Sequence, residues 1–367
     1  MSENRRFKVI LLAGHVDRPG PGSYAVDLVR GLCNEGHEVF LIARAFPPPE
    51  VFSGLEVPVR LFRQLRAWGL GGAMRKWLMR ELRAFGPDLL HVATPRLGPI
   101  GRKIAQRLEI PSVVTVHGGA VGEKELTARH LRGASVVAAS QAVRQDLVNQ
   151  LRIPKSHITV IYPGVKVRPG PLAVPGGDGQ STVIGTLGML DYVEGQRFLL
   201  AGARKVLDRG LDVQVLVAGS GPEKADLRDR AAQLELGENV TFTEDISRPR
   251  ELIEIMNIFV LPTMRDGMMP VVLEAMGLGK PVVVSGAGGI FAAVQDNHTG
   301  LVFPKGDPDA LAAAVVRLML KPDFTARIAR EGRELVRQEF SLDRMLEKTL
   351  QLYGRIVEYH APVAEAE

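Results

Sequence analysis

Residues 263–290 read TMRDGMMPVVLEAMGLGKPVVVSGAGGI, and this stretch decides the fold of the C-terminal half of the chain. It follows an apolar run, Ile258–Leu261, which predicts a buried strand. Pro270 suits the first turn of a helix, and Pro281–Ser285 predicts the next buried strand. A strand, a helix and a second strand in this order indicate a parallel sheet with helices on its faces.

The same alternation of short apolar runs and amphipathic stretches extends along the whole chain. Further strands are expected at Phe7–Ala13, Glu38–Ala43, Leu89–Ala93, Ser112–Val116, Val136–Ala139, Thr159–Tyr162, Thr182–Leu187, Val213–Ala218, Val240–Thr243 and Leu301–Phe303. Helical patterns such as Ser23–Glu35 and Gln141–Leu151 lie between them. The predicted fold class is therefore α/β, with doubly wound parallel sheets.

A segment rich in proline and glycine and without periodicity, residues 168–180, predicts a linker. It separates an N-terminal domain, residues 1–167, from a C-terminal domain, residues 181–341. The final helical stretch, within residues 342–360, has no strand after it and is expected to pack back on the N-terminal domain. Because ligands bind beyond the carboxyl ends of parallel strands, we expect the site in a cleft between two domains that face each other.

The length of 367 residues favours two domains, and the composition is that of an ordinary soluble globular protein. The net charge of +5 and the pI of about 9.4 permit attraction to anionic ligands or lipids. Cys33 is the only cysteine, which excludes an intramolecular disulfide and fits a reducing cytoplasm. The apolar run Val9–Ala13 is too short for a signal sequence or a membrane span. We expect a cytoplasmic protein that is at most peripheral on the inner face of a membrane.

Two carboxylates in the opening stretch are candidates for binding a ligand with phosphate and sugar groups. Asp266 lies in the loop after a strand, and Glu274 lies eight residues later in the helix. Backbone N–H groups of Gly267, Met268 and Met269, at the helix entry, could hold phosphate oxygens. The Glu274 carboxylate could accept hydrogen bonds from sugar hydroxyls, because an acid among apolar neighbours is costly to bury unpaired. The alternative is a carboxylate satisfied by nearby backbone or by an arginine.

Glycine-rich loops follow several of the predicted strands. They contain Gly20 and Gly22, Gly219 and Gly221, and Gly286, Gly288 and Gly289. Glycines let the backbone approach a ligand closely, and a helix N-terminus after them attracts phosphate. A flexible first loop is the alternative for Gly20 and Gly22, and a tight strand-to-helix turn would explain Gly219 and Gly221 without a ligand. The recurrence of such loops on one side of the C-terminal sheet indicates a nucleotide-like, phosphate-bearing ligand within residues 181–305.

His117 is the candidate of the N-terminal half, because it follows the predicted strand Ser112–Val116 and precedes Gly118. At the carboxyl end of a strand it would face the expected cleft. There it could hydrogen-bond a substrate or a reacting sugar hydroxyl. A loop histidine satisfied by its neighbours is the alternative.

Basic and aromatic residues alternate between Arg60 and Phe85. The set contains Arg60, Arg63, Arg66, Arg75, Lys76, Arg80 and Arg83, interleaved with leucines, phenylalanines, Trp68 and Trp77. This pattern suits the surface of an anionic membrane. The alternative is a solvated helical face with ordinary core contacts. Nucleic acid is not expected as a partner, because no recognised binding module accompanies the charge.

Taken together, these segments resemble the retaining GT-B glycosyltransferases of family 4, over about residues 7–355. The resemblance is strongest from Val213 to Phe340, in VLVAGSGPE, LGENVTF, DGMMPVVLEAMGLGKPVVVS, HTGLVFPKGDPDALA and EGRELVRQEFS. The N-terminal half is similar through PGPGS, LVRGLCNEGHEV, TVHGG, ASQAVRQDLV and ITVIYPGV. The resemblance implies two Rossmann-like domains and the transfer of a sugar from a nucleotide-sugar donor.

The resemblance also implies roles for individual residues. Glu274 matches the glutamate that binds the nucleotide ribose. Asp266 stands where the family has a glutamate near the transferred sugar, and His117 matches the histidine beside that sugar. Asp266 and His117 are therefore the catalytic candidates.

Glycine-rich loops are expected to bring backbone to the same donor. The resemblance places Gly20 near the diphosphate, and Gly22, Gly188 and Gly219 lie in loops expected to line the donor. The implied donor is a UDP-, GDP- or ADP-linked sugar, and the implied acceptor is a glycan or a lipid-linked glycan. No cofactor is expected, because the family's chemistry needs no metal ion and the sequence shows no metal-ligand cluster.

Several residues depart from the family pattern. The loop after the first C-terminal strand usually carries an arginine and a lysine, which neutralise the diphosphate leaving group. Here Met189 occupies the place of the arginine and Glu194 that of the lysine. Arg197 and Arg265 are nearby cations that could replace them, and Asp266 is one methylene shorter than the usual glutamate.

These departures leave two functions open. The first is an active glycosyltransferase in the synthesis of cell-surface polysaccharide or glycolipid. The second is a catalytically impaired relative that binds nucleotides or serves as a scaffold partner of an active glycosyltransferase. A sugar-nucleotide epimerase of the same fold is disfavoured by the order of the C-terminal motifs.

Overall fold

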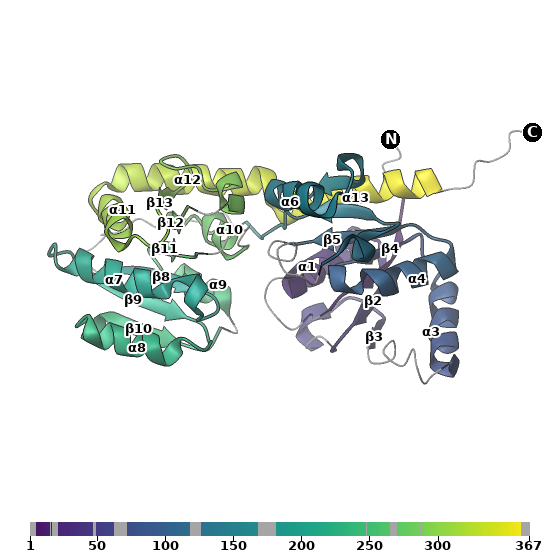
Figure 1. The fold of residues 1–367 in the computed structure, drawn as a ribbon, viewed down its shortest axis with the longest axis horizontal. Coiled ribbons are helices and arrows are strands. Elements are labelled where there is room, and N and C mark those ends of the chain that lie inside the picture. Colours follow the sequence, from purple (N-terminus) through teal and green to yellow (C-terminus); the bar gives the residue numbers. More distant parts are fainter. Residues whose placement is uncertain are drawn as a thin grey trace, which may run out of the picture. The chain divides into compact units, whose positions relative to one another are not determined.

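The computed structural model describes residues 5–14, 16, 21–46, 49–61, 72–117, 126–167, 181–246, 248–264, 270–286 and 288–360. The chain divides into two compact units. One is formed by Met1–Gly164 together with Leu342–Glu367, and the other by Val165–Ser341. We call them the N-terminal unit and the C-terminal unit, and each contains one parallel sheet with helices packed on it (Figure 1).

Within the described residues, the sheet of the N-terminal unit is parallel and has the order β3-β2-β1-β4-β5-β6-β7. Its strands are β1 (Lys8–Leu12), β2 (Glu38–Ala43), β3 (Val59–Leu61), β4 (Leu89–Val92), β5 (Ser112–Val116), β6 (Ser135–Ala138) and β7 (Ile158–Val160). Its helices are α1 (Pro21–Asn34), α3 (Gly72–Phe85), α4 (Gly98–Leu108), α5 (Ala128–Leu131), α6 (Gln141–Leu151) and α13 (Leu342–His360).

The described sheet of the C-terminal unit is also parallel, in the order β10-β9-β8-β11-β12-β13. Its strands are β8 (Thr182–Leu187), β9 (Val213–Ala218), β10 (Val240–Thr243), β11 (Ile258–Leu261), β12 (Val282–Ser285) and β13 (Leu301–Phe303). Its helices are α7 (Gln196–Leu207), α8 (Lys224–Gln233), α9 (Pro249–Glu254), α10 (Pro270–Gly277), α11 (Pro308–Leu320) and α12 (Pro322–Glu339).

The central strands are apolar on both faces because helices cover both faces of each sheet. Strand β1 shows this directly. Val9 and Leu11 belong to the apolar cluster on one face, whereas Ile10 and Leu12 belong to the cluster on the other face. Successive side chains of a strand point to opposite faces, so a strand buried on both faces needs a continuous apolar run.

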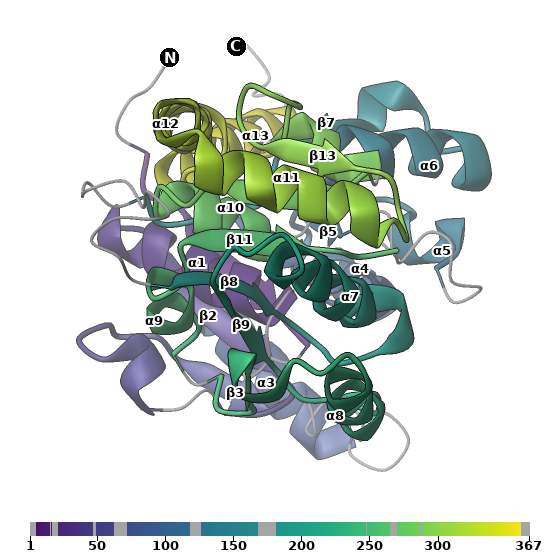
Figure 2. The ribbon, with the colours of Figure 1, turned by 90° about the vertical axis from the view of Figure 1, so that its left-hand side faces the viewer.

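Helices α7 and α11 lie side by side over the C-terminal sheet (Figure 2). Gly202 of α7 permits this close approach, because a Cβ atom there would lie 2.7 Å from a methyl carbon of Leu311. Asp307 caps the start of α11 by accepting hydrogen bonds from the backbone N–H groups of Asp309 and Ala310, both at 3.0 Å. The cap and the following Pro308 explain why the helix begins there.

Helix α13 packs on the N-terminal unit, although it follows the C-terminal unit in the sequence. It contacts α1, and Gly31 of α1 leaves room for Leu346, whose nearest atom would lie 3.2 Å from a Cβ at that position. Met345, Leu352 and Tyr353 are buried in the same apolar cluster as β1 and α1. The core of this unit is therefore built from two separate parts of the chain.

The α/β fold class with two Rossmann-like domains is confirmed, and every strand expected from the sequence is present with its ends shifted by at most two residues. The sequence pattern did not predict strand β3. This strand is short and carries Arg60 at its centre, whose guanidinium forms two hydrogen bonds of 2.9 Å with the carboxylate of Glu81. A basic residue in the middle of three hides the apolar pattern that marks the other strands.

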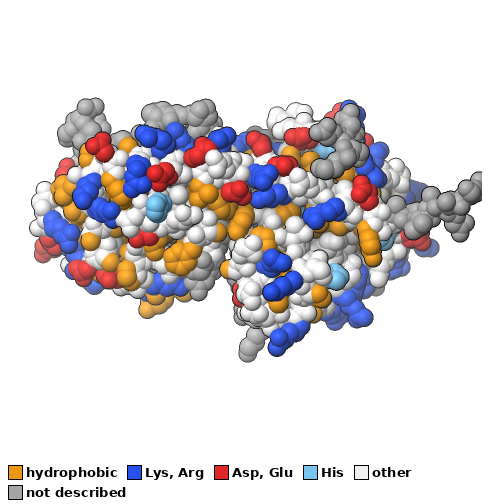
Figure 3. Space-filling view, turned by 90° about the horizontal axis from the view of Figure 1, so that it is seen from above, with side chains coloured by type: hydrophobic (Ala, Val, Ile, Leu, Met, Phe, Trp, Pro, Cys, Tyr) orange, Lys and Arg blue, Asp and Glu red, His pale blue; other side chains and the backbone are white. Residues whose placement is uncertain are grey.

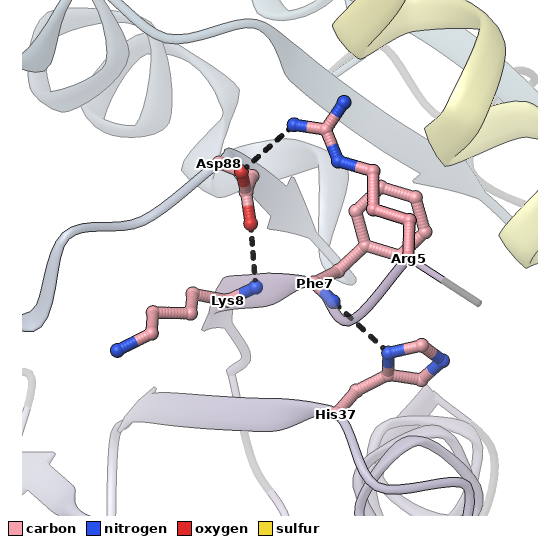
Figure 4. Close-up of polar contacts among 5 residues, drawn as sticks. All are labelled: Arg5, Phe7, Lys8, His37 and Asp88. Atoms are coloured by element: carbon pink, nitrogen blue, oxygen red, sulfur yellow. Dashed lines mark hydrogen bonds and ion pairs between the residues drawn. The ribbon is translucent and has the colours of Figure 1, made fainter. Parts of the chain in front are cut away.

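Polar side chains form hydrogen bonds with the backbone at the amino end of β1 (Figure 4). The Asp88 carboxylate accepts hydrogen bonds from the Lys8 backbone N–H at 2.8 Å and from the Arg5 guanidinium at 3.1 Å. Nδ1 of His37 accepts from the Phe7 backbone N–H at 3.0 Å. These residues fix β1 against its neighbours at the edge opposite to the one where α/β sheets bind ligands.

Candidate functional site

The strand order of the C-terminal sheet places a switch point between β8 and β11. From β8 the chain continues to β9 on one side, and from β11 it continues to β12 on the other. Segments that leave two such strands in opposite directions open a crevice at the carboxyl edge, which is where doubly wound sheets bind ligands. The two segments here are Gly188–Gly195 and the stretch from Pro262 into α10.

Segment Gly188–Gly195 is held at this edge by backbone hydrogen bonds to both neighbours. The Leu190 N–H donates to the Ser220 carbonyl at 2.9 Å, which ties the segment to the turn after β9. The Met264 N–H donates to the Val193 carbonyl at 2.7 Å, which ties it to the end of β11. The segment is therefore a fixed rim of the switch point.

Two glycines are required where this rim meets its neighbours. Gly219 has φ +149°, and a Cβ there would lie 1.8 Å from the Gly188 carbonyl oxygen. Gly195 has φ +73°, and its Cβ would lie 2.2 Å from the Pro262 carbonyl oxygen. The close backbone contact is a sufficient reason for a glycine at position 219. Gly188, in contrast, has open space where its Cβ would stand.

The two positions that depart from the family pattern lie on this rim. The Met189 side chain is 61% exposed, and Glu194 ends a short 3-10 helix, Tyr192–Glu194. The guanidinium of Arg197 lies 3.6 Å from the centre of the Tyr192 ring and donates to the Tyr192 carbonyl at 2.9 Å. A cation is therefore held beside the rim, stacked on an exposed aromatic ring.

Helix α10 carries Glu274 on the other side of the switch point. Glu274 is half-buried between the buried residues Leu273 and Ala275. Pro270, which the sequence places in the first turn, is the first described residue of this helix. Asp266, Gly267, Met268 and Met269, like Arg265, lie outside the described residues.

An open pocket with a volume of about 530 Å³ lies at the carboxyl ends of the last two strands, β12 and β13. Gly286, which directly follows β12, lines it together with Phe291 and Phe303. Phe291 is 51% exposed and belongs to a short 3-10 helix, Gly288–Ala292. The glycine-rich segment after β12 thus lies at the same edge of the sheet as the switch point.

In the N-terminal unit, His117 directly follows β5, next to the carboxyl end of β4. Its ring hydrogen-bonds the backbone of Ala93, whose free acceptor is the carbonyl, because the Ala93 N–H already donates to Leu12. Among the described residues Nε2 of His117 has no hydrogen-bond partner and is enclosed, so Nδ1 makes the bond to Ala93. Burial lowers the pKa of His117 to about 4, which the hydrogen bond to Ala93 opposes. His117 is therefore neutral near pH 7, and its Nε2 is a buried acceptor without a partner among the described residues.

Other N-terminal candidates are only partly within the described chain. Gly22 lies in the first turn of α1, and Gly20 lies outside the described residues. The loops after β1 and β4 meet where the Gly14 N–H donates to Oγ1 of Thr94 at 3.2 Å. β1 and β4 form the switch point of this sheet, and His117 lies one strand further along.

No sequence signal pointed to a second histidine, His91, which is fully buried in β4. Its Nδ1 lies 2.5 Å from the Tyr353 hydroxyl, and its Nε2 lies 2.7 Å from Oγ1 of Thr115. Burial lowers the pKa of His91 to about 3, and His117 acts in the same direction. His91 therefore stays neutral inside the core.

The two neutral histidines predict that stability falls with acidity from about pH 6.5 downward. The unfolded chain binds protons at the ordinary histidine pKa of ~6.5, whereas the folded pKa values of about 3 and about 4 keep the native rings uncharged. Each ring then contributes a slope of up to ~1.4 kcal/mol per pH unit between these limits. Urea unfolding at pH 7, 6 and 5 measures this. His91→Gln and His117→Gln should flatten the dependence, whereas the exposed His157→Gln should not, and a pH-independent midpoint would contradict the assignment.

The basic stretch near residue 60 is described only in part, and the described part has core contacts. In α3, Leu78, Met79 and Leu82 are buried in the N-terminal core and Trp77 packs against them. The apolar side chains of this helix therefore make ordinary core contacts. None of the described helices combines the length and the apolar character needed to cross a membrane.

Charges elsewhere on the described surface are largely mixed. On the face seen in Figure 3, Lys and Arg side chains are interspersed with Asp and Glu side chains. Ion pairs such as Arg327–Glu331 at 3.1 Å join neighbouring turns of a helix. No group of three or more His, Cys, Asp or Glu side chains that could hold a metal ion occurs within the described ranges.

Comparison with known proteins identifies both halves of the chain. Residues 181–321 match the family model described as glycosyl transferases group 1, and residues 20–168 match the model of glycosyltransferase family 4. Two doubly wound units that carry these matches define the class, and the chain belongs to the GT-B glycosyltransferases.

Individual relatives agree with this class. An uncharacterised glycosyltransferase of Methanocaldococcus jannaschii is 24% identical over 361 residues, which cover 89% of this chain and 92% of that one. A D-inositol 3-phosphate glycosyltransferase of Salinispora tropica is 26% identical over an alignment of 412 positions, which covers 95% of this chain and 83% of that one. The capsular polysaccharide biosynthesis glycosyltransferase CapM of Staphylococcus aureus is 30% identical over 174 residues, 47% of this chain and 46% of that one.

Solved structures share the fold. The crystal structure of Anabaena HepE in complex with UDP superposes with a TM-score of 0.78 at 18% identity, covering 95% of this chain and 100% of that one. A glycosyltransferase of Rickettsia africae superposes with a TM-score of 0.77, also at 18% identity, and the match covers 97% and 100%.

Proposed function

We propose that this glycosyltransferase transfers a sugar, with retention of configuration, from a nucleotide-sugar donor to a glycan or lipid-linked acceptor. The observation that carries the proposal is the switch point of the C-terminal sheet. The rim Gly188–Gly195 and the helix that carries Glu274 leave neighbouring strands at the same carboxyl edge. A relative named for capsular polysaccharide biosynthesis supports a glycan acceptor.

In the proposed site, the C-terminal unit holds the donor. The Glu274 carboxylate accepts hydrogen bonds from the ribose hydroxyls. The backbone N–H groups of Gly267, Met268 and Met269 receive the phosphate oxygens at the start of α10, where the helix dipole favours negative charge. Asp266 stands near the transferred sugar.

Further backbone contacts come from the loops around the donor. Gly188 belongs to the fixed rim and has open space beside it. Gly219 shapes this rim through its contact with Gly188. The resemblance to the family implies further backbone contacts to the diphosphate at Gly20 and Gly22.

His117 contributes an acceptor rather than a proton to the proposed reaction. Its Nδ1–H is used by the Ala93 carbonyl, so the lone pair of Nε2 accepts a hydrogen bond from a hydroxyl of the transferred sugar. In a retaining transfer the acceptor hydroxyl attacks the anomeric carbon from the face that the diphosphate leaves. The proposed reaction needs no metal ion, as the resemblance to the family implies.

The proposed place of action is the cytoplasm, at the inner face of the membrane when the acceptor is lipid-linked. Because the apolar side chains of α3 are buried in the core, such an association would rest on exposed cations such as Lys76 and Arg80. Attraction of that kind weakens as salt rises.

A second function is favoured by one observation. Met189 and Glu194 stand where the family has an arginine and a lysine that neutralise a departing diphosphate, and neither side chain carries a positive charge. A protein with this rim could bind nucleotides and serve a scaffold role beside an active glycosyltransferase.

Titration calorimetry with UDP, GDP and ADP, followed by assays of donor hydrolysis and transfer with the matching sugar conjugates, separates these functions. UDP is the first nucleotide to test, because the similar HepE structure contains it. Binding with turnover supports the enzyme, and binding without turnover supports the impaired relative. Absence of binding to all three nucleotides would overturn the proposed site.

A further inference from the structure

Four buried side chains from four different elements form one chain of hydrogen bonds in the N-terminal unit. The Tyr24 hydroxyl of α1 lies 3.3 Å from Oγ1 of Thr115 in β5. The same oxygen lies 2.7 Å from Nε2 of His91 in β4, whose Nδ1 lies 2.5 Å from the Tyr353 hydroxyl of α13. We call these four residues the buried relay.

The relay is unusual for its surroundings, because the neighbouring core positions are apolar. Tyr353 and His91 have no exposed surface, and Thr115 and Tyr24 are 1% and 6% exposed. Each of these polar groups would destabilise the core if it lost its partner. Such a network is better suited to fixing one geometry than to adding stability, since apolar residues of similar size would pack at lower cost.

The hydrogen bonds of the relay must all run in the same donor-to-acceptor direction. A neutral imidazole has one donor and one acceptor nitrogen, so His91 must accept from one hydroxyl and donate to the other. If the Tyr353 hydroxyl donates to Nδ1, then Nε2–H donates to Thr115 and the Thr115 hydroxyl donates to Tyr24. In the other arrangement, the Tyr24 hydroxyl donates to Thr115, the Thr115 hydroxyl donates to Nε2, and Nδ1–H donates to the Tyr353 hydroxyl. Removing a hydroxyl at one end therefore changes the arrangement as far as Tyr24.

Tyr24 is also the residue that packs against the imidazole of His117. The two rings are in an edge-to-face arrangement, with centroids 4.9 Å apart and an interplanar angle of 72°. His117 also contacts the backbone of Ala93, which follows the strand that carries His91. These two contacts of His117 therefore come from parts of the chain that the buried relay connects.

We propose that Tyr353 of α13, acting through His91, Thr115 and Tyr24, positions the imidazole of His117 for the bound donor. The inference rests on the proposed function, because it takes the donor sugar as the group that Nε2 of His117 meets. Tyr353 does not touch the reacting atoms and is a positioning residue. Its effect passes from the C-terminal helix to the carboxyl edge of the N-terminal sheet.

The first test is Tyr353→Phe, which removes the hydroxyl and keeps the ring that packs edge-on against Phe7 at 6.1 Å. Thr115→Val breaks the relay at its centre, and Thr115→Ser keeps the hydroxyl. Tyr359→Phe is the matched control, because Tyr359 lies on the same helix and is 94% exposed. Urea unfolding of all four variants reports whether each remains folded under assay conditions.

The readout that needs no activity is the imidazole of His117, followed by long-range ¹⁵N–¹H correlation in protein labelled at histidine and assigned with His117→Gln. The His117 signals should shift in Tyr353→Phe and Thr115→Val and stay in place in Tyr359→Phe. Unchanged signals in both relay variants would overturn the inference. This holds even if the wild-type protein shows no turnover, a result that would count against the proposed function alone.

For active protein, the kinetic constants give the second readout. Misplacement of His117 should lower kcat about tenfold in Tyr353→Phe and Thr115→Val, with the KM for the donor little changed. Thr115→Ser should restore most of kcat relative to Thr115→Val. A relay that serves only stability would lower the urea midpoint and leave kcat unchanged, which would also overturn the inference.

Discussion

Replacing Glu274 with glutamine should weaken the binding of a nucleoside diphosphate by about tenfold to a hundredfold. The substitution keeps the size of the side chain and exchanges a charged acceptor for a neutral amide. Hydrogen bonds to a charged group contribute ~1.5–3 kcal/mol, and ~1.4 kcal/mol corresponds to a factor of ten in affinity. Calorimetry with UDP measures the change.

The ribose hydroxyls can be tested separately with 2′-deoxy-UDP. Wild-type protein should prefer UDP, and the preference should disappear in Glu274→Gln if the carboxylate accepts from these hydroxyls. Glu331→Gln is the control, because Glu331 lies on α12 in a surface ion pair, and such pairs contribute little. Equal affinity of wild-type and Glu274→Gln for UDP would show that the ribose lies elsewhere.

Restoring two cations to the rim, with Met189→Arg and Glu194→Lys together, should raise the rate of donor cleavage about tenfold or more. The Met189 side chain is 61% exposed, so a longer side chain fits at the carboxyl edge without displacing the core. The change removes a negative charge and adds two positive charges where a diphosphate would leave. Groups that stabilise such developing charge commonly contribute ~10²-fold or more. The rate is measured by release of UDP from a saturating sugar donor.

A control must change the net charge by the same amount at the opposite edge. Leu320→Arg with Glu238→Lys does so, because Leu320 ends α11 and Glu238 lies just before β10. Both positions are exposed. A gain confined to the rim variant indicates a weakened catalytic site. An equal gain in both variants would point to general electrostatic attraction, and no gain in either would indicate that Arg197 or another cation already serves the diphosphate.

Much of the fold could be predicted because its signals are local. Buried parallel strands require continuous apolar runs, and segments such as Val213–Ala218 and Ile258–Leu261 show them directly. Prolines mark helix starts, as Pro270 and Pro308 do. Strand β3 was not predicted because its central residue, Arg60, is charged. The partner of that charge, Glu81, lies 21 positions further along the chain, in α3.

The candidate site was predictable only at the level of strand ends. A residue that follows a strand lies at the carboxyl edge, which places His117 and the rim Gly188–Gly195 without any knowledge of contacts. The requirement for Gly219 came from its approach to Gly188, and sequence alone could not separate that cause from a ligand.

The buried relay could not have been found from the sequence. Tyr353 and His91 are 262 positions apart, and Tyr24 and Thr115 are 91 apart. Hydrogen bonds across such separations depend on packing that no local period reports. The only trace is a histidine within the apolar strand LLHV.

The packing of α13 on the N-terminal unit has a consequence for the order of events during synthesis. The C-terminal unit is one uninterrupted stretch, Val165–Ser341, so its whole core is available before the last helix is made. The N-terminal unit leaves the ribosome first, yet its apolar core stays incomplete until Met345, Leu352 and Tyr353 arrive. Domains generally fold from the N-terminus onward as they emerge. Here the half of the protein that is made first is the half that must wait to finish folding.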